Sequence, residues 1–148
     1  MIELQHATPI ELNLIQELYR IHLGQTVDID WLVQSCSSTR DILYVLYLDG
    51  VLGGFVHAVW SGGPYELLGI CVRPDLRRRG LAFAGITRLL SELRQKQVAE
   101  LWLEVRADNH GAYHLYKETG AIETGRRSRY YPDGMDALLM TYVIDSRS

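Results

Sequence analysis

Apolar and polar residues follow two different periods along this chain, and together they predict a mixed α/β protein. Short β-rich runs bounded by turn residues indicate strands. The predicted strands are Ile2–His6, Ile42–Leu48, Val51–Ser61, Tyr65–Val72, Leu101–Val105, Ala121–Tyr131 and Met135–Ile144. Tight turns are expected at Asp49-Gly50 and around Pro132-Asp133-Gly134, because these residue types favour turn conformations.

Apolar residues three and four positions apart predict helices between these strands. The first helix follows a capping box at Thr8-Pro9-Ile10-Glu11 and runs to about Leu23. Its buried face is expected to carry Ile10, Leu14, Ile15, Leu18 and Ile21. Further helices are expected near Asp30–Ser37, from Leu81 through Leu93, and over about Asn109–Glu118, where Gly120 ends the last one.

The order of these elements predicts an antiparallel meander, then a strand–helix–strand–helix unit, then a closing hairpin. In such α/β arrangements, ligands bind where strands meet the starts of helices. No Pro- or Ser-rich linker and no internal repeat divides the sequence, so residues 1–148 are expected to form a single domain.

Composition limits the function classes. The chain is 47% apolar and 22% charged, which is ordinary for a globular protein, and its net charge of −3 argues against nucleic-acid binding. Cys36 and Cys71 are far apart and predict neither a disulfide framework nor a zinc site. Acidic residues near the N-terminus and the lack of a long apolar run predict neither a signal peptide nor a membrane anchor, so a cytoplasmic location is expected.

One segment carries the strongest chemical signal. Arg77-Arg78-Arg79-Gly80-Leu81-Ala82 lies between the predicted strand Tyr65–Val72 and the predicted helix from Leu81. The first backbone N–H groups of a helix have no partner within it and carry the positive end of its dipole, so they can bind a phosphate. Gly80 and Ala82 leave room for such an anion. The alternative is a solvated basic turn, yet the preceding strand and the small residues favour a pyrophosphate site.

The same segment resembles the acetyl-coenzyme A signature of the GNAT superfamily of N-acetyltransferases, Q/R-x-x-G-x-G/A, here Arg77-x-x-Gly80-x-Ala82. The resemblance extends from Glu66 to the end of the chain. It is most specific for the RimI-like branch, the ribosomal-protein alanine N-acetyltransferases, whose pattern is matched by Leu101-Trp102-Leu103-Glu104-Val105-Arg106, Asn109, Tyr116, Gly120, Arg129-Tyr130-Tyr131-Pro132 and Asp136-Ala137. It implies a mixed, mostly antiparallel central sheet of about seven strands with helices on both faces.

The resemblance also implies acetyl-coenzyme A as the co-substrate. Its implied binding residues are Ile70, Cys71, Val72, Arg77, Arg78, Arg79, Gly80, Leu81, Ala82, Phe83 and Asn109. Of these, the backbone at 70–72 would bond the pantetheine arm along an open strand edge, where the strands at Cys71 and Glu104 splay apart. Asn109 has a second possible role as a helix cap. No metal is expected, because His110 and His114 lack a third ligand in a recognisable motif.

Two residues are expected to carry the catalysis. Glu104 lies within an apolar strand run, where a carboxylate often marks function, and we predict that it is the general base. The competing role for Glu104 is a salt bridge with Arg106, and Glu66 is a rival base. The resemblance makes Tyr116 the proton donor to the leaving thiolate, whereas its position also suits a core residue. Cys71 is expected to be a small buried residue and no nucleophile.

The expected acceptor is a primary amine, most specifically a protein N-terminal α-amine. The alternatives are a lysine, a small amine metabolite, or an acyl-coenzyme A sensor without turnover. Tyr130 and Tyr131 are expected beside the acceptor, together with Glu66. Because adjacent strand residues alternate between faces, at most one of the two tyrosines is expected to face the groove. The expected partners are acetyl-coenzyme A and a peptide N-terminus or small amine, without nucleic acid or membrane, and the expected state is a monomer or homodimer.

Overall fold

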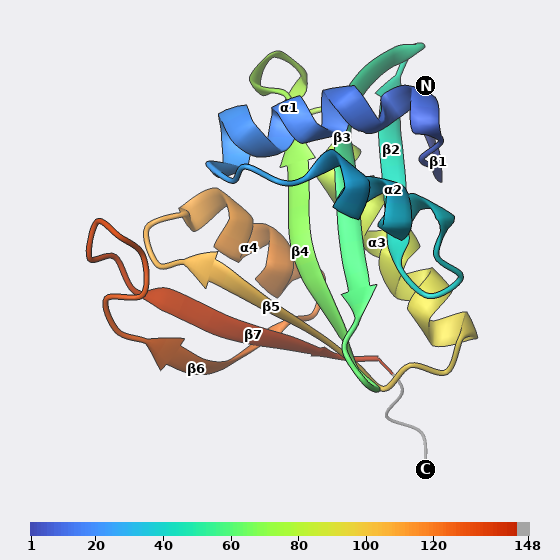
Figure 1. Ribbon diagram of the computed structural model, residues 1–148. Coiled ribbons are helices and arrows are strands. Elements are labelled where there is room, and N and C mark those ends of the chain that lie inside the picture. Colours follow the sequence, from blue (N-terminus) through green and yellow to red (C-terminus); the bar gives the residue numbers. More distant parts are fainter. Residues whose placement is uncertain (145–148) are drawn as a thin grey trace.

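A computed structural model describes residues 1–144 and contains one seven-stranded sheet in the order β1-β2-β3-β4-β5-β7-β6 (Figure 1). The last four residues of the predicted domain, 145–148, lie outside the described part. The strands are β1 (Ile2–His6), β2 (Ile42–Leu48), β3 (Val51–Trp60), β4 (Tyr65–Val72), β5 (Glu100–Arg106), β6 (Ile122–Arg127) and β7 (Ala137–Val143). All neighbouring strands are antiparallel except β4 and β5, which confirms the predicted mixed sheet.

Helices cover both faces of the sheet, as expected (Figure 1). They are α1 (Leu12–Leu23), α2 (Ile29–Ser37), α3 (Leu81–Gln95) and α4 (His110–Glu118). The buried side chains form one cluster under α1 and α2 and a second under α3 and α4. In Figure 1, α1 and α2 lie across β2, β3 and β4, and they leave the adjoining face of β5, β6 and β7 uncovered by any helix of residues 1–144.

The two parallel strands separate soon after they begin. β4 and β5 pair only at Tyr65 with Leu101 and at Glu66 with Trp102, after which both edges are left open. Between Leu67 and Gly69, β4 also contains one residue, Leu68, that has no counterpart on β3. Such a bulge bends a strand. The predicted splay is therefore confirmed, and it begins directly after Glu66.

The buried face of α1 differs from the prediction. Ile15 and Leu18 are buried as expected, whereas Ile10, Leu14 and Ile21 are 89%, 43% and 53% exposed. The buried face instead consists of Leu12, Ile15, Leu18 and Tyr19. The sequence places apolar residues on both sides of this helix, so periodicity alone cannot choose the face that packs on the sheet.

The closing hairpin is also shorter than predicted. β6 ends at Arg127, and residues 128–136 form a loop in which Arg129 has a left-handed φ of 50°. The backbone N–H of Arg129 donates to the Asp136 carboxylate at 2.9 Å, which stabilises this turn. Tyr130 and Tyr131 therefore lie on a loop, and the expected strand alternation does not govern which of them faces the groove.

A buried polar chain under α1 and α2 was not predicted from the sequence. The Tyr19 hydroxyl lies 2.8 Å from Nδ1 of His57, Ser35 Oγ lies 2.8 Å from Nε2 of His57, and Ser35 donates to Asp41 at 2.7 Å. Burial lowers the pKa of His57 to about 4, so the ring is neutral at pH 7. Because a neutral imidazole has one N–H, Tyr19 donates to Nδ1 and Nε2 donates to Ser35. This chain joins both helices to β3.

Candidate active site

The turn before α3 presents a row of free backbone donors. Arg78 and Gly80 have left-handed φ values of 63° and 85°, and the first helical bond runs from Ala84 N–H to Gly80 O at 2.9 Å. The N–H groups from Arg78 to Phe83 find no acceptor among residues 1–144. These donors, at the positive end of a 15-residue helix, fit the pyrophosphate that the resemblance implies. Gly80 suits its place because an L side chain is strained at this φ.

The arginines of this turn differ in their contacts. Arg77 donates from Nε to the carbonyl of Val72 at 3.1 Å and so ties the turn to the end of β4. Arg78 and Arg79 are exposed. Arg77 therefore has a structural contact that the sequence did not indicate, while its two neighbours remain open to an anion.

Ile70, Cys71 and Val72 form the end of β4, beyond its pairing with β5. Cys71 is only 4% exposed and belongs to the cluster under α1, and burial raises the pKa of its thiol to about 11. Cys71 is thus a small buried residue, as predicted. At the start of α4, Asn109 accepts a hydrogen bond from the Ala112 N–H at 3.1 Å, so the capping role considered for Asn109 is present.

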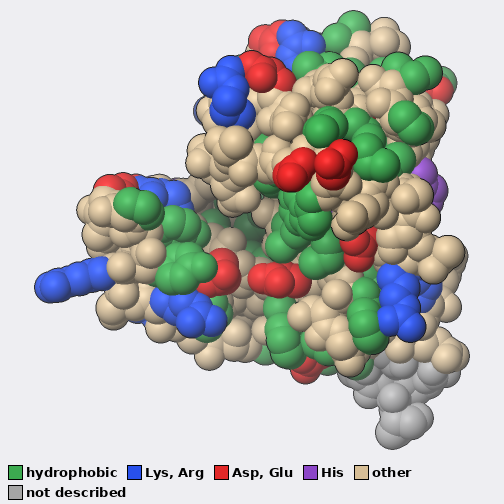
Figure 2. Space-filling view, in the orientation of Figure 1, with side chains coloured by type: hydrophobic (Ala, Val, Ile, Leu, Met, Phe, Trp, Pro, Cys, Tyr) green, Lys and Arg blue, Asp and Glu red, His purple; other side chains and the backbone are tan. Residues whose placement is uncertain are grey.

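A pocket of about 210 Å³ lies on the uncovered face where β4 and β5 diverge. Figure 2 shows the hollow between the part of the molecule that carries α1 and α2 and the part formed by β6 and β7, with acidic side chains beside it. Its lining comprises Glu66, Trp102, Leu103, Glu104, Thr124, Arg127, Leu139, Met140 and Thr141. Both candidate bases therefore face the same small pocket.

Glu104 forms an ion pair, but with a different partner from the one considered in the sequence. Its Oε2 lies 3.1 Å from Nε of Arg127, whereas Arg106 contacts Asp108 and Asp133. Arg127 belongs to β6, which is separated from β5 by β7, so its long side chain crosses one strand to reach Glu104. The Glu104–Arg106 pair considered from the sequence is therefore wrong, because strand order brings a residue distant in sequence closer.

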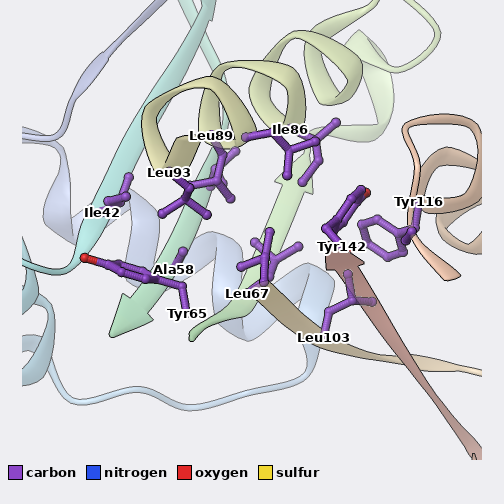
Figure 3. Close-up of a cluster of buried hydrophobic side chains, with 14 of the residues drawn as sticks. Ile42, Ala58, Tyr65, Leu67, Ile86, Leu89, Leu93, Leu103, Tyr116 and Tyr142 are labelled. Atoms are coloured by element: carbon purple, nitrogen blue, oxygen red, sulfur yellow. The ribbon is translucent and has the colours of Figure 1, made fainter. Parts of the chain in front are cut away.

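Tyr116 lies in the core cluster under α3 and α4. Figure 3 shows its ring beside Tyr142, close to Leu103, and Tyr116 is only 6% exposed. Its hydroxyl has no hydrogen-bond partner among residues 1–144, although every fully enclosed side-chain N or O atom in this part has one. The hydroxyl therefore touches solvent. Burial, and then the charges of Tyr142 and Tyr131, raise the pKa of Tyr116, so it is protonated at neutral pH.

Tyr130 and Tyr131 of the β6–β7 loop differ in their exposure to solvent. The two rings meet edge to face at 5.1 Å, Tyr130 is 50% exposed, and Tyr131 is half-buried. The pKa of Tyr131 is raised by burial and next by the charge of Glu104. The guanidinium carbon of Arg106, two residues after Glu104 on β5, lies 4.9 Å from the centroid of the Tyr131 ring, so this ring lies over the strand that carries Glu104. Glu66 and Glu104 thus share one pocket, Tyr131 lies beside Arg106 of β5, and Tyr130 is the more exposed of the two tyrosines.

The sequence did not indicate Trp102 or Arg127 as site residues. Trp102 could have been found, because it lies two residues before Glu104 and strand alternation places both on one face. Arg127 could not have been found, because its ion pair with Glu104 depends on the order of the strands in the sheet. A second hollow of about 580 Å³, beside Trp60 and Trp102 at the start of β4 and β5, was also not predicted.

Within residues 1–144, no three His, Cys, Asp or Glu side chains gather as metal ligands would. His110 and His114 therefore have no third ligand of these types in this part of the chain. Across the same residues, none of the helices combines the length and the apolar character needed to span a membrane.

The splayed parallel strands, the free amides before α3 and the acidic pocket define the class of protein. Residues 11–121 match the Acetyltransferase (GNAT) family, and the chain belongs to this family. The [ribosomal protein bS18]-alanine N-acetyltransferase of Escherichia coli K12 is 46% identical over 81 residues, a match that covers 53% of this chain and 55% of that protein. The match thus spans about half the length of that curated relative.

Two more comparisons extend over longer stretches. A relative from Bacillus subtilis is 32% identical over 102 residues, or 68% of each chain. The crystal structure of the ribosomal-protein-S18-alanine N-acetyltransferase from Escherichia coli superposes with a TM-score of 0.88 at 28% identity, covering 100% of this chain and 97% of that one. The RimI-like resemblance is therefore confirmed, together with the GNAT fold.

Proposed function

We propose that this chain transfers the acetyl group of acetyl-coenzyme A to the α-amine of a protein N-terminus that begins with alanine. The observation that carries the proposal is the position of Glu66 and Glu104 on one pocket at the point where β4 and β5 diverge. In a chain of the GNAT family, this is the place where a cofactor on the strand edge and an amine in the pocket can meet. Acetyl-coenzyme A is the co-substrate of this family, and the free amides from Arg78 to Phe83 suit its pyrophosphate.

The residues of the site supply position, a base and an acid. When bound, acetyl-coenzyme A presents the acetyl group as a thioester, and the acceptor nitrogen forms the C–N bond as the C–S bond breaks. Glu104 accepts a proton from the ammonium form of the acceptor through a water molecule. Tyr116 donates its hydroxyl proton to the departing sulfur and regains a proton from the acetylated nitrogen through water. The raised pKa of Tyr116 means that the hydroxyl carries its proton before transfer.

The side chains of the site, the basicity of the amine and the named relatives favour an α-amine as the acceptor. The pocket carries two carboxylates, which attract a cationic terminus, and the half-buried Tyr131 beside Arg106 offers a flat ring for a peptide. An α-amine with a pKa of about 8 is roughly one-tenth neutral at pH 7, whereas a lysine with a pKa of about 10.4 is neutral only a few times in ten thousand. The relatives named for alanine acetylation support the residue type.

Glu66 is the competing base. It lies on β4 at the last residue that pairs with β5, so its carboxylate also reaches the pocket. We assign Glu104 because Tyr131, the expected acceptor wall, lies beside Arg106 on the same strand as Glu104, two residues further along β5. A comparison of Glu104→Gln with Glu66→Gln separates the two assignments.

Mass spectrometry of a peptide library after incubation with the chain and acetyl-coenzyme A tests the proposal. We expect acetylation at the α-amine of peptides that begin with alanine. Exclusive modification of lysine side chains, or of small polyamines alone, would contradict the proposed acceptor. Binding of acetyl-coenzyme A without transfer to any amine would indicate a sensor instead.

A further inference from the structure

Arg106 makes four hydrogen bonds that the proposed reaction does not explain. It lies on β5, two residues after Glu104, and strand alternation places it on the same face. Its Nη1 and Nη2 donate to the two carboxylate oxygens of Asp133 at 3.3 and 2.6 Å. Its Nε and Nη2 also donate to Asp108 at 3.1 and 3.2 Å. Arg106 thus holds two carboxylates at once in the paired geometry that suits a guanidinium.

One of these carboxylates belongs to the β6–β7 loop. Asp133 lies 27 residues after Arg106, and its Oδ1 also accepts the N–H of Met135 at 3.1 Å. Within the same loop, Tyr131 N–H donates to Met135 O at 3.1 Å and Gly134 N–H donates to Tyr131 O at 2.8 Å. The contact with Arg106 therefore fixes a short hydrogen-bonded turn that contains Tyr131.

Arg106 also contacts the tyrosine ring directly. The guanidinium carbon lies 4.9 Å from the centroid of the Tyr131 ring, within the range of a cation–π contact. The outward-facing Tyr130 instead lies over Arg127, at 5.7 Å. Arg106 is thus the cation that supports the half-buried tyrosine next to Glu104.

We propose that Arg106 is a positioning residue that sets the acceptor specificity of the site by holding the loop 128–136 so that Tyr131 forms a wall on the Glu104 side of the pocket. Arg106 touches neither reacting group in this arrangement and acts through Asp133 and Tyr131. This inference rests on the proposed function, since it assigns the wall to an acceptor peptide. Lysine cannot replace the arginine, because it offers no planar fork for the two carboxylates and no flat surface for the ring.

The kinetic test compares Arg106→Lys with wild type on a peptide that begins with alanine. We expect the acceptor KM to rise about fivefold, with the affinity for acetyl-coenzyme A unchanged and kcat within about twofold. In a Tyr131→Ala background, Arg106→Lys should cause no further rise in KM, because the effect passes through Tyr131. Arg126→Lys is the matched control, since Arg126 also forms an exposed ion pair in this hairpin, with Asp136 at 2.7 Å instead of Asp133.

A second measurement does not depend on the reaction. Hydrogen exchange at the N–H groups of Tyr131 and Gly134 should accelerate in Arg106→Lys and in Asp133→Asn, and should stay unchanged in Arg126→Lys. Unaltered exchange in Arg106→Lys would overturn the inference, as would an equal rise in acceptor KM with and without Tyr131. If wild type acetylates no peptide, the proposed function fails and so does the role in acceptor specificity, even where the exchange result shows that Arg106 holds the loop.

Discussion

The turn before α3 and the uncovered face of β5–β7 both belong to the candidate site, yet they are built from different atoms. The turn offers backbone N–H groups, from Arg78 to Phe83, that are set by two left-handed residues and a helix start. The uncovered face offers side chains, among them Glu104, Arg127 and Tyr131, that come from separate strands and a loop. The first region depends on local chain conformation, and the second depends on how distant segments meet.

This difference predicts how the two regions tolerate change. A backbone site survives the loss of a single side chain, provided that the chain keeps its path. A site of side chains loses function when one group is replaced, because each group has its own role. The substitutions below test that contrast.

The largest expected effect is at Gly80. Gly80→Glu should lower the affinity for acetyl-coenzyme A by about 10³-fold or more, because it adds strain at a φ of 85° and places a negative charge at the proposed pyrophosphate site. Isothermal titration calorimetry measures this. Gly24→Glu is the matched control, since Gly24 has a φ of 65° at the end of α1 and a Cβ added there would meet no atom within 4 Å. Equal affinity in folded Gly80→Glu would remove the proposed cofactor site.

The second-largest effect is expected at Glu104. Glu104→Gln should lower kcat about 10²-fold and leave the affinity for acetyl-coenzyme A unchanged. The defect should shrink as pH rises toward the pKa of the acceptor amine, about 8, because the amine then loses its proton without help. Measuring kcat of wild type and of Glu104→Gln over a series of pH values tests this prediction. Should Glu66→Gln be damaging and Glu104→Gln silent, Glu66 is the base.

Tyr116→Phe should lower kcat about 30-fold, less than Glu104→Gln, because a thiolate with a pKa of about 8.5 leaves readily. The melting temperature should stay within error of wild type, since the hydroxyl has no partner among residues 1–144 and the ring still fills the core beside Tyr142. Steady-state kinetics and thermal melts test both parts. A large fall in melting temperature with normal kcat would show that Tyr116 is a core residue and not the proton donor.

The same contrast explains how much the sequence could predict. Strands such as Tyr65–Val72 and the turn around Gly80 follow from local patterns. The predicted splay between the strands at Cys71 and Glu104 follows from the family resemblance, whereas its start after Glu66 comes from the structure. The buried face of α1 could not be chosen, because apolar residues lie on two sides of the helix. The partner of Glu104 could not be found either, because Arg127 reaches it across β7.

On the loop, Tyr131→Ala should raise the acceptor KM about tenfold, whereas Tyr130→Ala should change it less than about twofold. The reason is exposure, since Tyr131 is half-buried near Glu104 while Tyr130 is 50% exposed. Affinity for acetyl-coenzyme A should be unaltered in both variants. The reverse order of the two effects would mean that the loop turns its other tyrosine toward the acceptor.

The smallest expected effect is at Arg79, in the turn before α3. Arg79→Ala should weaken acetyl-coenzyme A binding by less than about threefold, because an exposed charge contributes a screened interaction and the free N–H groups remain. Raising the salt concentration should shrink that difference further, which titrations at low and high salt can measure. Arg77→Ala tests a different contact, because Arg77 Nε donates to the Val72 carbonyl. We expect this substitution to lower the melting temperature and to leave the affinity for acetyl-coenzyme A nearly unchanged. A tenfold loss of affinity in Arg79→Ala would show that side chains govern the turn as they govern the uncovered face, and the contrast between the two regions would fail.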